Sequence, residues 1–399
     1  MAYEEITRHG WLSRIGASFK GILAGAVILA VAVSLQFWNE GRTVKREQAL
    51  SEGRAQVLES AGAQPDAAND GRLVHVAGRA RAGAPLADET FGVEHEALAL
   101  RRQVQMFQWR ERRDTREEKE VGGGTRKVTR YSYETVWDDE PIDSDDFREE
   151  EAHRNPDEMP YRDYSWRAAD IRIGGFRLGD EAASQIGGWQ DLPAAQVQLP
   201  ENLAAIFRPS GDWFVTCETP AQPQVGDLRV RFQIVPEGAF TVIGRQQAGM
   251  LDTWRSSRGQ ELLIVESGEH GAAALFDEAA SDNTSASWAL RLAGFVLGWI
   301  GFGLLLRPLA VLADVVPILG RLVGFGLALV SGLLAAVLSL VAIGSGWVFY
   351  RPWLLAVIVI VVVALIAWLV MRRSRRSVTV PPMPAPAPAP SRPPPPPGA

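Results

Sequence analysis

Residues 288–308 read WALRLAGFVLGWIGFGLLLRP, and the apolar part of this stretch, 288–306, contains a single charge, Arg291. A helix of this length spans the hydrocarbon core of a bilayer, which is about 30 Å thick, because each residue adds about 1.5 Å. Three further apolar runs lie at 21–38, 322–343 and 353–371. The sequence therefore predicts four transmembrane helices, one N-terminal and three C-terminal.

The ends of these runs predict where the helices stop. The first run could be a cleaved signal peptide, but it ends in Phe37-Trp38-Asn39-Glu40 without a small-residue cleavage site, so we expect a retained helix. We expect the second helix to stop at Arg307-Pro308. The segment 344–352 is rich in glycine and aromatic residues, which favours a tight interfacial turn before the last helix.

Basic residues predict the orientation of the chain. Four arginines between 372 and 376 follow the last span, and such clusters favour the cytoplasm. Counting back over three spans puts 39–287 outside the cytoplasm and the N-terminal segment 1–20 inside it. Basic residues flank 21–38 equally on both sides, so the C-terminal cluster decides. The segment 372–399 is basic and then proline-rich, and we expect a disordered cytoplasmic tail.

The segment 39–287 is polar and long enough for one or two lobes. Its first twenty residues continue the helix out of the membrane in our interpretation. Runs at 98–110 and 127–137 alternate like strands around a charged stretch that ends in Gly122-Gly123-Gly124, which predicts a long twisted hairpin with a solvated tip. Further strands are expected near 73–78, 213–218, 227–235, 240–246 and 261–265. The predicted fold class is therefore a membrane protein of the α+β type with a large β-rich extracytoplasmic domain.

Motifs for catalysis or metal binding are missing from the sequence. The five histidines show no paired metal-binding spacing, and the single cysteine, Cys217, lies in an apolar strand where we expect a buried thiol. No nucleophile elbow or phosphate-binding loop occurs. The acidic run at 138–146 favours a solvated loop over a cation site. We therefore expect no enzyme, metal or cofactor, and the net charge of -6 argues against nucleic acid as a partner.

Residues at and near the predicted spans are the candidate interaction sites. Gly294 and Gly298 form a GxxxG pattern, which favours close helix packing. Arg307, Asp314 and Arg321 surround the connector between the second and third spans, where they could form an ion path or docking surface, or be ordinary flanking charges. Arg351 lies in the predicted interfacial turn.

Several short segments resemble one known family. The matching segments are Asn39-Glu40-Gly41-Arg42, Gly71-Arg72-Leu73-Val74-His75, the run 100–109, Thr129-Arg130-Tyr131-Ser132-Tyr133, the run 225–230 and the run 346–352. In this order, and with the four-span layout, the chain resembles transmembrane protein forty-three, also called LUMA, over nearly its whole length except for the proline-rich tail.

The resemblance implies a non-enzymatic protein of the endoplasmic reticulum and inner nuclear membrane in animals, with self-association and with emerin and lamin partners. The arginine-rich composition suggests a bacterial member, which would lack those two partners. It would lie in the inner membrane with its domain in the periplasm.

Two functions remain open at this point. The leading hypothesis is a membrane scaffold or membrane-organising protein, a homo-oligomer that docks an unknown protein partner through 39–287. The alternative is an ion channel or channel subunit, with Arg307, Asp314 and Arg321 near a mouth. Three or four spans per chain are too few for a wide pore, so the channel would require an oligomer.

Overall fold

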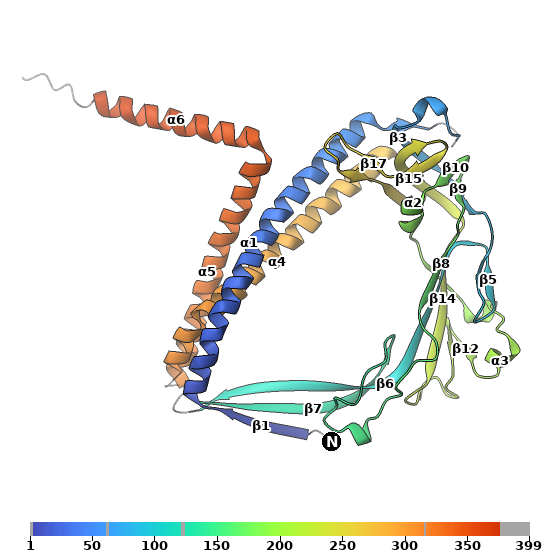
Figure 1. Cartoon of the computed structure of the whole chain (residues 1–399), viewed down its shortest axis with the longest axis horizontal. Coiled ribbons are helices and arrows are strands. Elements are labelled where there is room, and N and C mark those ends of the chain that lie inside the picture. Colours follow the sequence, from blue (N-terminus) through green and yellow to red (C-terminus); the bar gives the residue numbers. More distant parts are fainter. Residues whose placement is uncertain (1–2, 61–63, 121–123, 315–316, 376–399) are drawn as a thin grey trace, which may run out of the picture. The chain divides into compact units, whose positions relative to one another are not determined.

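The computed structural model describes residues 3–60, 64–120, 124–314 and 317–375 (Figure 1). They divide into two compact units, Met1–Gly346 and Trp347–Ala399. The first unit holds three long helices and all the strands that the structure describes. The second begins in the last turn of the third long helix and contains α6, Pro352–Arg375.

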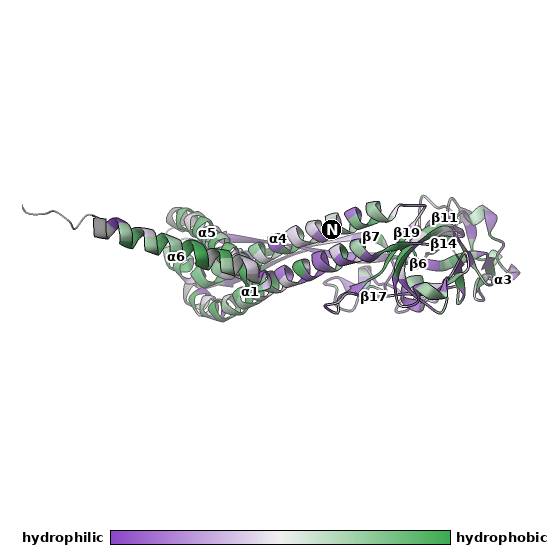
Figure 2. Cartoon of the chain, turned by 90° about the horizontal axis from the view of Figure 1, so that it is seen from above, coloured by the Kyte–Doolittle hydropathy of each residue, from purple (hydrophilic) through white to green (hydrophobic). Residues whose placement is uncertain are grey.

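Three helices are long and apolar enough to cross a membrane (Figure 1). They are α1, Trp11–Gln56, α4, Ala272–Ala313, and α5, Pro317–Tyr350. Each contains one predicted span, and the fourth span lies in α6, which has a shorter apolar stretch at Val359–Arg372. Figure 2 shows hydrophobic residues over α5 and α6 and more hydrophilic ones where α1 and α4 approach the sheets. The predicted α+β membrane class is confirmed.

Two predicted helix ends are wrong. α4 continues through Arg307 and Pro308 to Ala313, and α5 continues through 344–350, where we expected a turn. Proline removes one backbone donor, but apolar surroundings favour a continued helix because its carbonyls and amides otherwise have no partner. Gly346 serves packing rather than bending, since a Cβ there would lie 2.8 Å from the Cβ of Glu40.

The β-rich domain contains two large sheets. The eight-stranded sheet has the order β1-β7-β6-β14-β13-β12, with β8 on β6 and β11 on β14. The seven-stranded sheet has the order β19-β15-β16-β10-β9-β3-β2. The strands of the first sheet are β1 Tyr3–His9, β6 Ala97–Lys119, β7 Thr125–Asp138, β8 Tyr164–Arg167, β11 Gln190–Leu192, β12 Arg208–Ser210, β13 Trp213–Val215 and β14 Leu228–Pro236. Those of the second are β2 Leu58–Glu59, β3 Leu73–Ala82, β9 Ile171–Ile173, β10 Phe176–Leu178, β15 Gly238–Gln247, β16 Met250–Asp252 and β19 Ile264–Ser267.

Short elements fill the connections between these strands. Two small ladders pair β4 with β5 and β17 with β18. The remaining bounds are β4 Leu86–Asp88, β5 Val93–His95, β17 Trp254–Arg255, β18 Glu261–Leu262, α2 Asp180–Ser184, α3 Glu201–Ala204, and the 3₁₀ turns η2 Ala67–Asn69, η3 Glu150–Ala152 and η4 Ala194–Gln196. The acidic segment is irregular from 139 to 163 apart from η3, as predicted.

A hydrophobic cluster joins the helices to the domain. Leu50 of α1 and Phe276 of α4 pack with Leu73 and Ile243 of the second sheet, and all four are buried. Burying such side chains contributes roughly 1.5–3 kcal/mol each. The parts of α1 and α4 beyond the predicted spans are therefore held firmly against the second sheet.

The predicted hairpin is confirmed. β6 and β7 pair in register from Met106↔Asp138 to Lys119↔Thr125. Residues 121–123 of the predicted tip lie outside the described residues. The alternation of apolar and polar residues that indicated the strands also fixes their register, because a shift by one residue would turn each side chain to the other face.

Strand β1 precedes α1 and pairs with β7, from Tyr3↔Tyr131 to His9↔Thr125. The charge pattern of the sequence predicts 1–20 and 39–287 on opposite sides of a bilayer. Because paired strands share one side, the pairing and that placement exclude each other. The charge count could not detect this contact, which joins residues more than a hundred positions apart. Either β1 pairs with β7, or α1 crosses a bilayer between the two segments, but not both.

Candidate functional site

Polar side chains link the three long helices inside their apolar surroundings. Arg291 of α4 donates two hydrogen bonds to Glu40 of α1, from Nε to Oε1 at 2.7 Å and from Nη2 to Oε2 at 2.9 Å. The two side chains are only 14% and 1% exposed. Further bonds run from Gln36 Nε2 to Ser339 Oγ, 3.0 Å, and from Asn39 Nδ2 to Ser287 Oγ, 3.2 Å. These contacts fix the relative register of α1, α4 and α5.

The partners of these groups were not predicted from the sequence. Arg291 is an isolated charge at the start of a predicted span, and Glu40 follows the end of another. A usable signal was present, since a charge inside an apolar run needs a counter-charge at the same membrane depth. With α1 and α4 antiparallel, Glu40 is the acidic residue two positions beyond the first span.

Asp314 forms a buried ion pair with a residue far from it in the sequence. Arg14 of α1 donates from Nη2 to Asp314 Oδ2 at 2.6 Å, and the aspartate side chain is 2% exposed. Arg307 instead lines a mainly apolar cavity of about 320 Å³ between α4 and α5. The side chain of Arg321 lies outside what the structure describes. Among the described side chains, Asp314 therefore forms a buried ion pair with Arg14 between the ends of α1 and α4.

Arg351 follows the last residue of α5. Its guanidinium carbon lies 5.5 Å from the centre of the Trp347 ring, and its backbone N–H donates to the Trp347 carbonyl at 3.1 Å. A cation over an indole ring is attracted by the ring's electron-rich face. This contact caps the end of α5.

The two predicted glycines lie at helix contacts within one chain. Gly294 is buried against the side chain of Gln36, and a Cβ on Gly298 would meet Ala335 of α5 at 3.4 Å. A closer crossing occurs between Gly25 of α1 and Gly301 of α4. A Cβ on Gly25 would lie 2.7 Å from the Gly301 carbonyl oxygen. Small residues thus allow the backbones of α1 and α4 to approach closely.

We expect Gly25→Ala to destabilise the helix bundle. Alanine favours a helix by roughly 1 kcal/mol over glycine, but here the methyl group would displace a backbone carbonyl, which costs about 1–3 kcal/mol. Gly303→Ala is the matched control, because its Cβ would meet nothing within 4 Å. Thermal unfolding in detergent should show a lower midpoint for Gly25→Ala and an unchanged or higher one for Gly303→Ala. Equal midpoints would contradict the close crossing.

Arginine and tryptophan side chains cover one face of the eight-stranded sheet. Arg229 lies between two indoles, with its guanidinium carbon 4.4 Å from the Trp213 centroid and 4.6 Å from that of Trp137. Arg231 stacks on Trp213 at 4.8 Å and Arg101 on Trp189 at 4.4 Å. We call these residues the arginine–tryptophan face: Arg101, Arg229, Arg231, Trp137, Trp189 and Trp213.

Glutamines on the neighbouring strands hold these arginines in place. Arg229 Nε donates to Gln105 Oε1 at 2.7 Å, and Arg231 Nε donates to Gln103 Oε1 at 2.7 Å. Burial, and then the nearby Arg231, lower the pKa of Arg229. Arg231 also pairs with Asp191, from Nη1 to Oδ1 at 3.3 Å. The face is therefore preorganised and half-exposed, and its three arginines outnumber this one carboxylate. Interfaces are enriched in these residue types.

A buried carboxylate anchors the acidic loop to the hairpin. Glu111 of β6 has a side chain only 3% exposed and accepts from the Arg148 backbone N–H at 2.6 Å and from Tyr133 Oη at 2.9 Å. Burial alone would raise the pKa of Glu111, but these donors and Arg113 together lower it. Burial, and then the bond to Glu111, raise the pKa of Tyr133 to about 12. The Tyr133 ring stacks on His153 with centroids 3.7 Å apart.

We expect Glu111→Gln to loosen this anchor at pH 7 by about 1–3 kcal/mol, the range for hydrogen bonds to a charged group. Because folding lowers the pKa of Glu111, its stabilisation is present above the unfolded value, near 4.5, and is lost as the pH falls through the folded value. The gap in thermal midpoint between wild type and variant should therefore narrow below pH 4.5. Glu134→Gln, whose exposed carboxylate pairs with Arg112, should change little. If the difference in thermal midpoint between wild type and Glu111→Gln does not change with pH, the charge of Glu111 does not stabilise the anchor.

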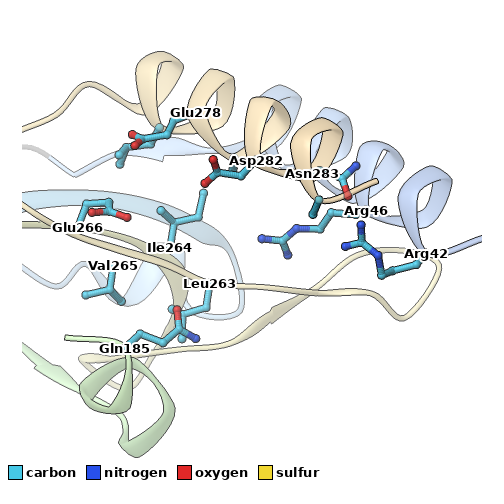
Figure 3. Close-up of a pocket in the computed structure, with 13 residues that line it drawn as sticks. Arg42, Arg46, Gln185, Leu263, Ile264, Val265, Glu266, Glu278, Asp282 and Asn283 are labelled. Atoms are coloured by element: carbon cyan, nitrogen blue, oxygen red, sulfur yellow. The ribbon is translucent and has the colours of Figure 1, made fainter. Parts of the chain in front are cut away.

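A pocket lies where α1 and α4 leave the predicted spans and meet the second sheet (Figure 3). Its volume is about 440 Å³. Arg42 and Arg46 line it from α1, while Glu278, Asp282 and Asn283 line it from α4 (Figure 3). Its other lining residues are Gln185, Leu263, Ile264, Val265, Glu266, Leu275, Ala279 and Ala286.

The described residues contain no metal-ligand cluster, and their one cysteine is buried. Within residues 3–60, 64–120, 124–314 and 317–375, no group of three His, Cys, Asp or Glu residues could hold a metal ion. Cys217 is buried, and burial together with the nearby Asp227 raises the pKa of its thiol. A protonated, buried thiol is a poor nucleophile.

Apolar helices joined by polar contacts, and carrying a large β-rich domain, define an integral membrane protein of the multi-pass class. The profile of the family Transmembrane protein 43 matches residues 106–352, more than half of the chain. Relatives of that name also align with most of the chain, so the chain belongs to the Transmembrane protein 43 family.

Transmembrane protein 43 of Homo sapiens is 34% identical over 365 residues, which is 87% of this chain and 89% of the human protein. The protein of that name from Rattus norvegicus is 33% identical over 359 residues, 86% of this chain and 88% of its own. The homolog from Drosophila melanogaster is 28% identical over 337 residues, covering 83% and 89%. No solved structure matches the chain. The resemblance noted in the sequence is therefore confirmed.

Proposed function

We propose that this protein is a non-enzymatic membrane scaffold that self-associates and docks a protein partner through its β-rich domain on the extracytoplasmic side. The arginine–tryptophan face carries the proposal. It presents three arginines already stacked on indoles and held by glutamines, so few side chains need to be ordered when a partner binds. The positive charge of the face favours an acidic partner surface.

The helix bundle supports an anchoring role. Its polar groups are used for contacts between helices, as in the buried pairs Glu40–Arg291 and Arg14–Asp314. Large apolar side chains on α5, including Leu333 and Leu340, are 66% and 72% exposed and can face lipid or a second copy. The channel alternative placed Arg307, Asp314 and Arg321 near a mouth, and the buried ion pair between Asp314 and Arg14 supports a packing role for Asp314 instead.

Photocrosslinking tests the docking surface. A photoreactive amino acid at Trp213 is expected to form adducts in native membranes, whereas one at Ile206, which is 53% exposed and outside the face, serves as the control. Arg229→Gln should reduce the Trp213 adducts about tenfold, because a loss of 1.4 kcal/mol corresponds to a factor of ten. Equal adducts at both positions, unchanged by Arg229→Gln, would refute docking through this face.

Stepwise photobleaching of the labelled chain in native membranes tests self-association. A scaffold should bleach in two or more steps per spot at natural expression levels. Single-step bleaching at every expression level would remove self-association from the proposal. This measurement does not depend on the partner, so the two parts of the proposal can fail separately.

A further inference from the structure

The pocket between α1, α4 and the second sheet, here called the juxtamembrane pocket, contains arginine N–H groups that donate no hydrogen bond to the rest of the described chain. Nε and Nη2 of Arg42 are buried and have no hydrogen-bond partner among the described residues. Arg46 donates from Nη1 to the Glu261 carbonyl at 3.0 Å, and its pKa is lowered by burial and then by Arg42. Two like charges one helical turn apart repel each other, and buried unpaired donors are costly. An anion between the two guanidinium groups would relieve both penalties.

The same pocket also contains acceptors. Asp282, Glu278 and Glu266 line it, and no ion pair within 4 Å joins these carboxylates to the two arginines in the described structure. Asn283 is only 8% exposed; its Nδ2 donates to the Thr43 carbonyl at 3.1 Å, and its Oδ1 is buried without a described partner. A simple anion would be repelled by three carboxylates, and a simple cation by two arginines. A ligand with one charge of each sign satisfies both groups.

The pocket lies at the depth of lipid headgroups. Trp38 and Trp288, at the ends of two predicted spans, are 56% and 64% exposed, as expected for residues at a membrane interface. The bond between Asn39 and Ser287 holds these ends at one level. At about 1.5 Å per residue, Arg42 stands roughly 6 Å beyond Trp38. The arginines therefore begin where the phosphate groups of a bilayer lie.

We propose that this pocket binds the headgroup of an ethanolamine phospholipid from the surrounding membrane. The phosphate lies between Arg42 and Arg46, which supply charge-assisted hydrogen bonds. The ammonium group lies toward Asp282 and Glu278, which line the pocket from α4 (Figure 3). The pocket volume of about 440 Å³ accommodates such a headgroup, and the acyl chains remain in the bilayer.

Native mass spectrometry of the full chain in mild detergent tests this proposal. The chain is equilibrated with equal amounts of phosphatidylethanolamine, phosphatidylcholine and phosphatidylglycerol that carry the same acyl chains. Wild type is expected to retain phosphatidylethanolamine about fivefold or more over phosphatidylcholine, whose trimethylated amine donates no hydrogen bonds. The double variant Arg42→Gln, Arg46→Gln should retain about tenfold less phosphatidylethanolamine than the wild type. Asp282→Asn with Glu278→Gln should shift the preference toward the anionic phosphatidylglycerol.

Arg54→Gln is the matched control, since Arg54 is also on α1, pairs with Asp277 of α4, and lies outside the pocket lining. It should retain lipid like the wild type. Thermal unfolding reports whether each variant folds. If the Arg42→Gln, Arg46→Gln double variant does not fold, the single variant Arg46→Gln takes its place in the lipid measurement. Equal retention of all three lipids, or wild-type retention in Arg46→Gln and the double variant, would overturn the proposal. If an equal concentration of soluble glycerophosphoethanolamine displaces the lipid, the claim that the headgroup comes from a membrane lipid is overturned.

Discussion

Cysteines introduced at Ile6 and Val128 are expected not to crosslink in intact membranes, and to crosslink once the chain is extracted into detergent. The two residues face each other in the register of β1 and β7. In a bilayer crossed by α1, they lie on opposite sides. Oxidation of the double cysteine variant, in a Cys217→Ala background, followed by a gel-shift assay measures the crosslink under both conditions.

The magnitudes favour membrane insertion over the strand pairing. β1 contributes seven residue pairs, each worth about 0.2–1 kcal/mol, so the pairing stabilises the chain by less than about 10 kcal/mol. The spans expose many large apolar side chains, such as Leu23, Leu292 and Leu340. Each gains roughly 1.5–3 kcal/mol on leaving water, which sums to tens of kcal/mol over α1, α4 and α5. The charged hairpin cannot follow through the lipid, because each charge costs several kcal/mol there.

A pair within the hairpin provides the control. Thr115 and Thr129 face each other with hydroxyl oxygens 3.2 Å apart, and both belong to the β-rich domain. Cysteines at these positions should crosslink in membranes and in detergent alike. If the 6/128 pair crosslinks in membranes as fully as the 115/129 pair, residues 3–9 share one side with the domain, and the four-span topology is wrong.

We expect Glu40→Gln to destabilise the helix bundle by about 3–5 kcal/mol. The substitution leaves the Arg291 guanidinium buried without its counter-charge, and removal of one partner from a buried pair costs this much. The thermal midpoint in detergent and the amount of folded protein in membranes should both fall sharply. Glu40→Gln combined with Arg291→Met should recover part of the loss, because the second change removes the uncompensated charge.

The exposed pair on the same two helices is the matched control. Arg54 and Asp277 also join α1 to α4, but their side chains are 47% and 71% exposed. Asp277→Asn should cost less than about 1 kcal/mol, since solvent screens the charge. If Asp277→Asn and Glu40→Gln shift the midpoint equally, burial does not govern the strength of the Glu40–Arg291 pair.

Local patterns in the sequence determined the spans, the hairpin and the fold class. A transmembrane span can be predicted from the length of an apolar run alone, because that length has to match the thickness of the bilayer and does not depend on other parts of the chain. Alternation at 127–137 likewise depends only on the period of a strand. Helix ends were harder to predict. Pro308 lies inside α4 in apolar surroundings that favour a continued helix, and Gly346 packs against Glu40, a contact that the local sequence does not show.

The candidate sites were determined mainly by the tertiary structure. Arg307, Asp314 and Arg321 are close in sequence and suggested a cluster, yet Asp314 pairs with Arg14, three hundred residues away. The pocket needs Arg42 and Arg46 from α1 and Asp282 from α4, more than two hundred positions later in the sequence. By itself, the sequence determined how much of the chain enters the membrane, because burial in lipid depends on composition along a single helix. Only the packing of α1 on α4 decided which charges meet, because an ion pair requires two side chains at one level on facing helices.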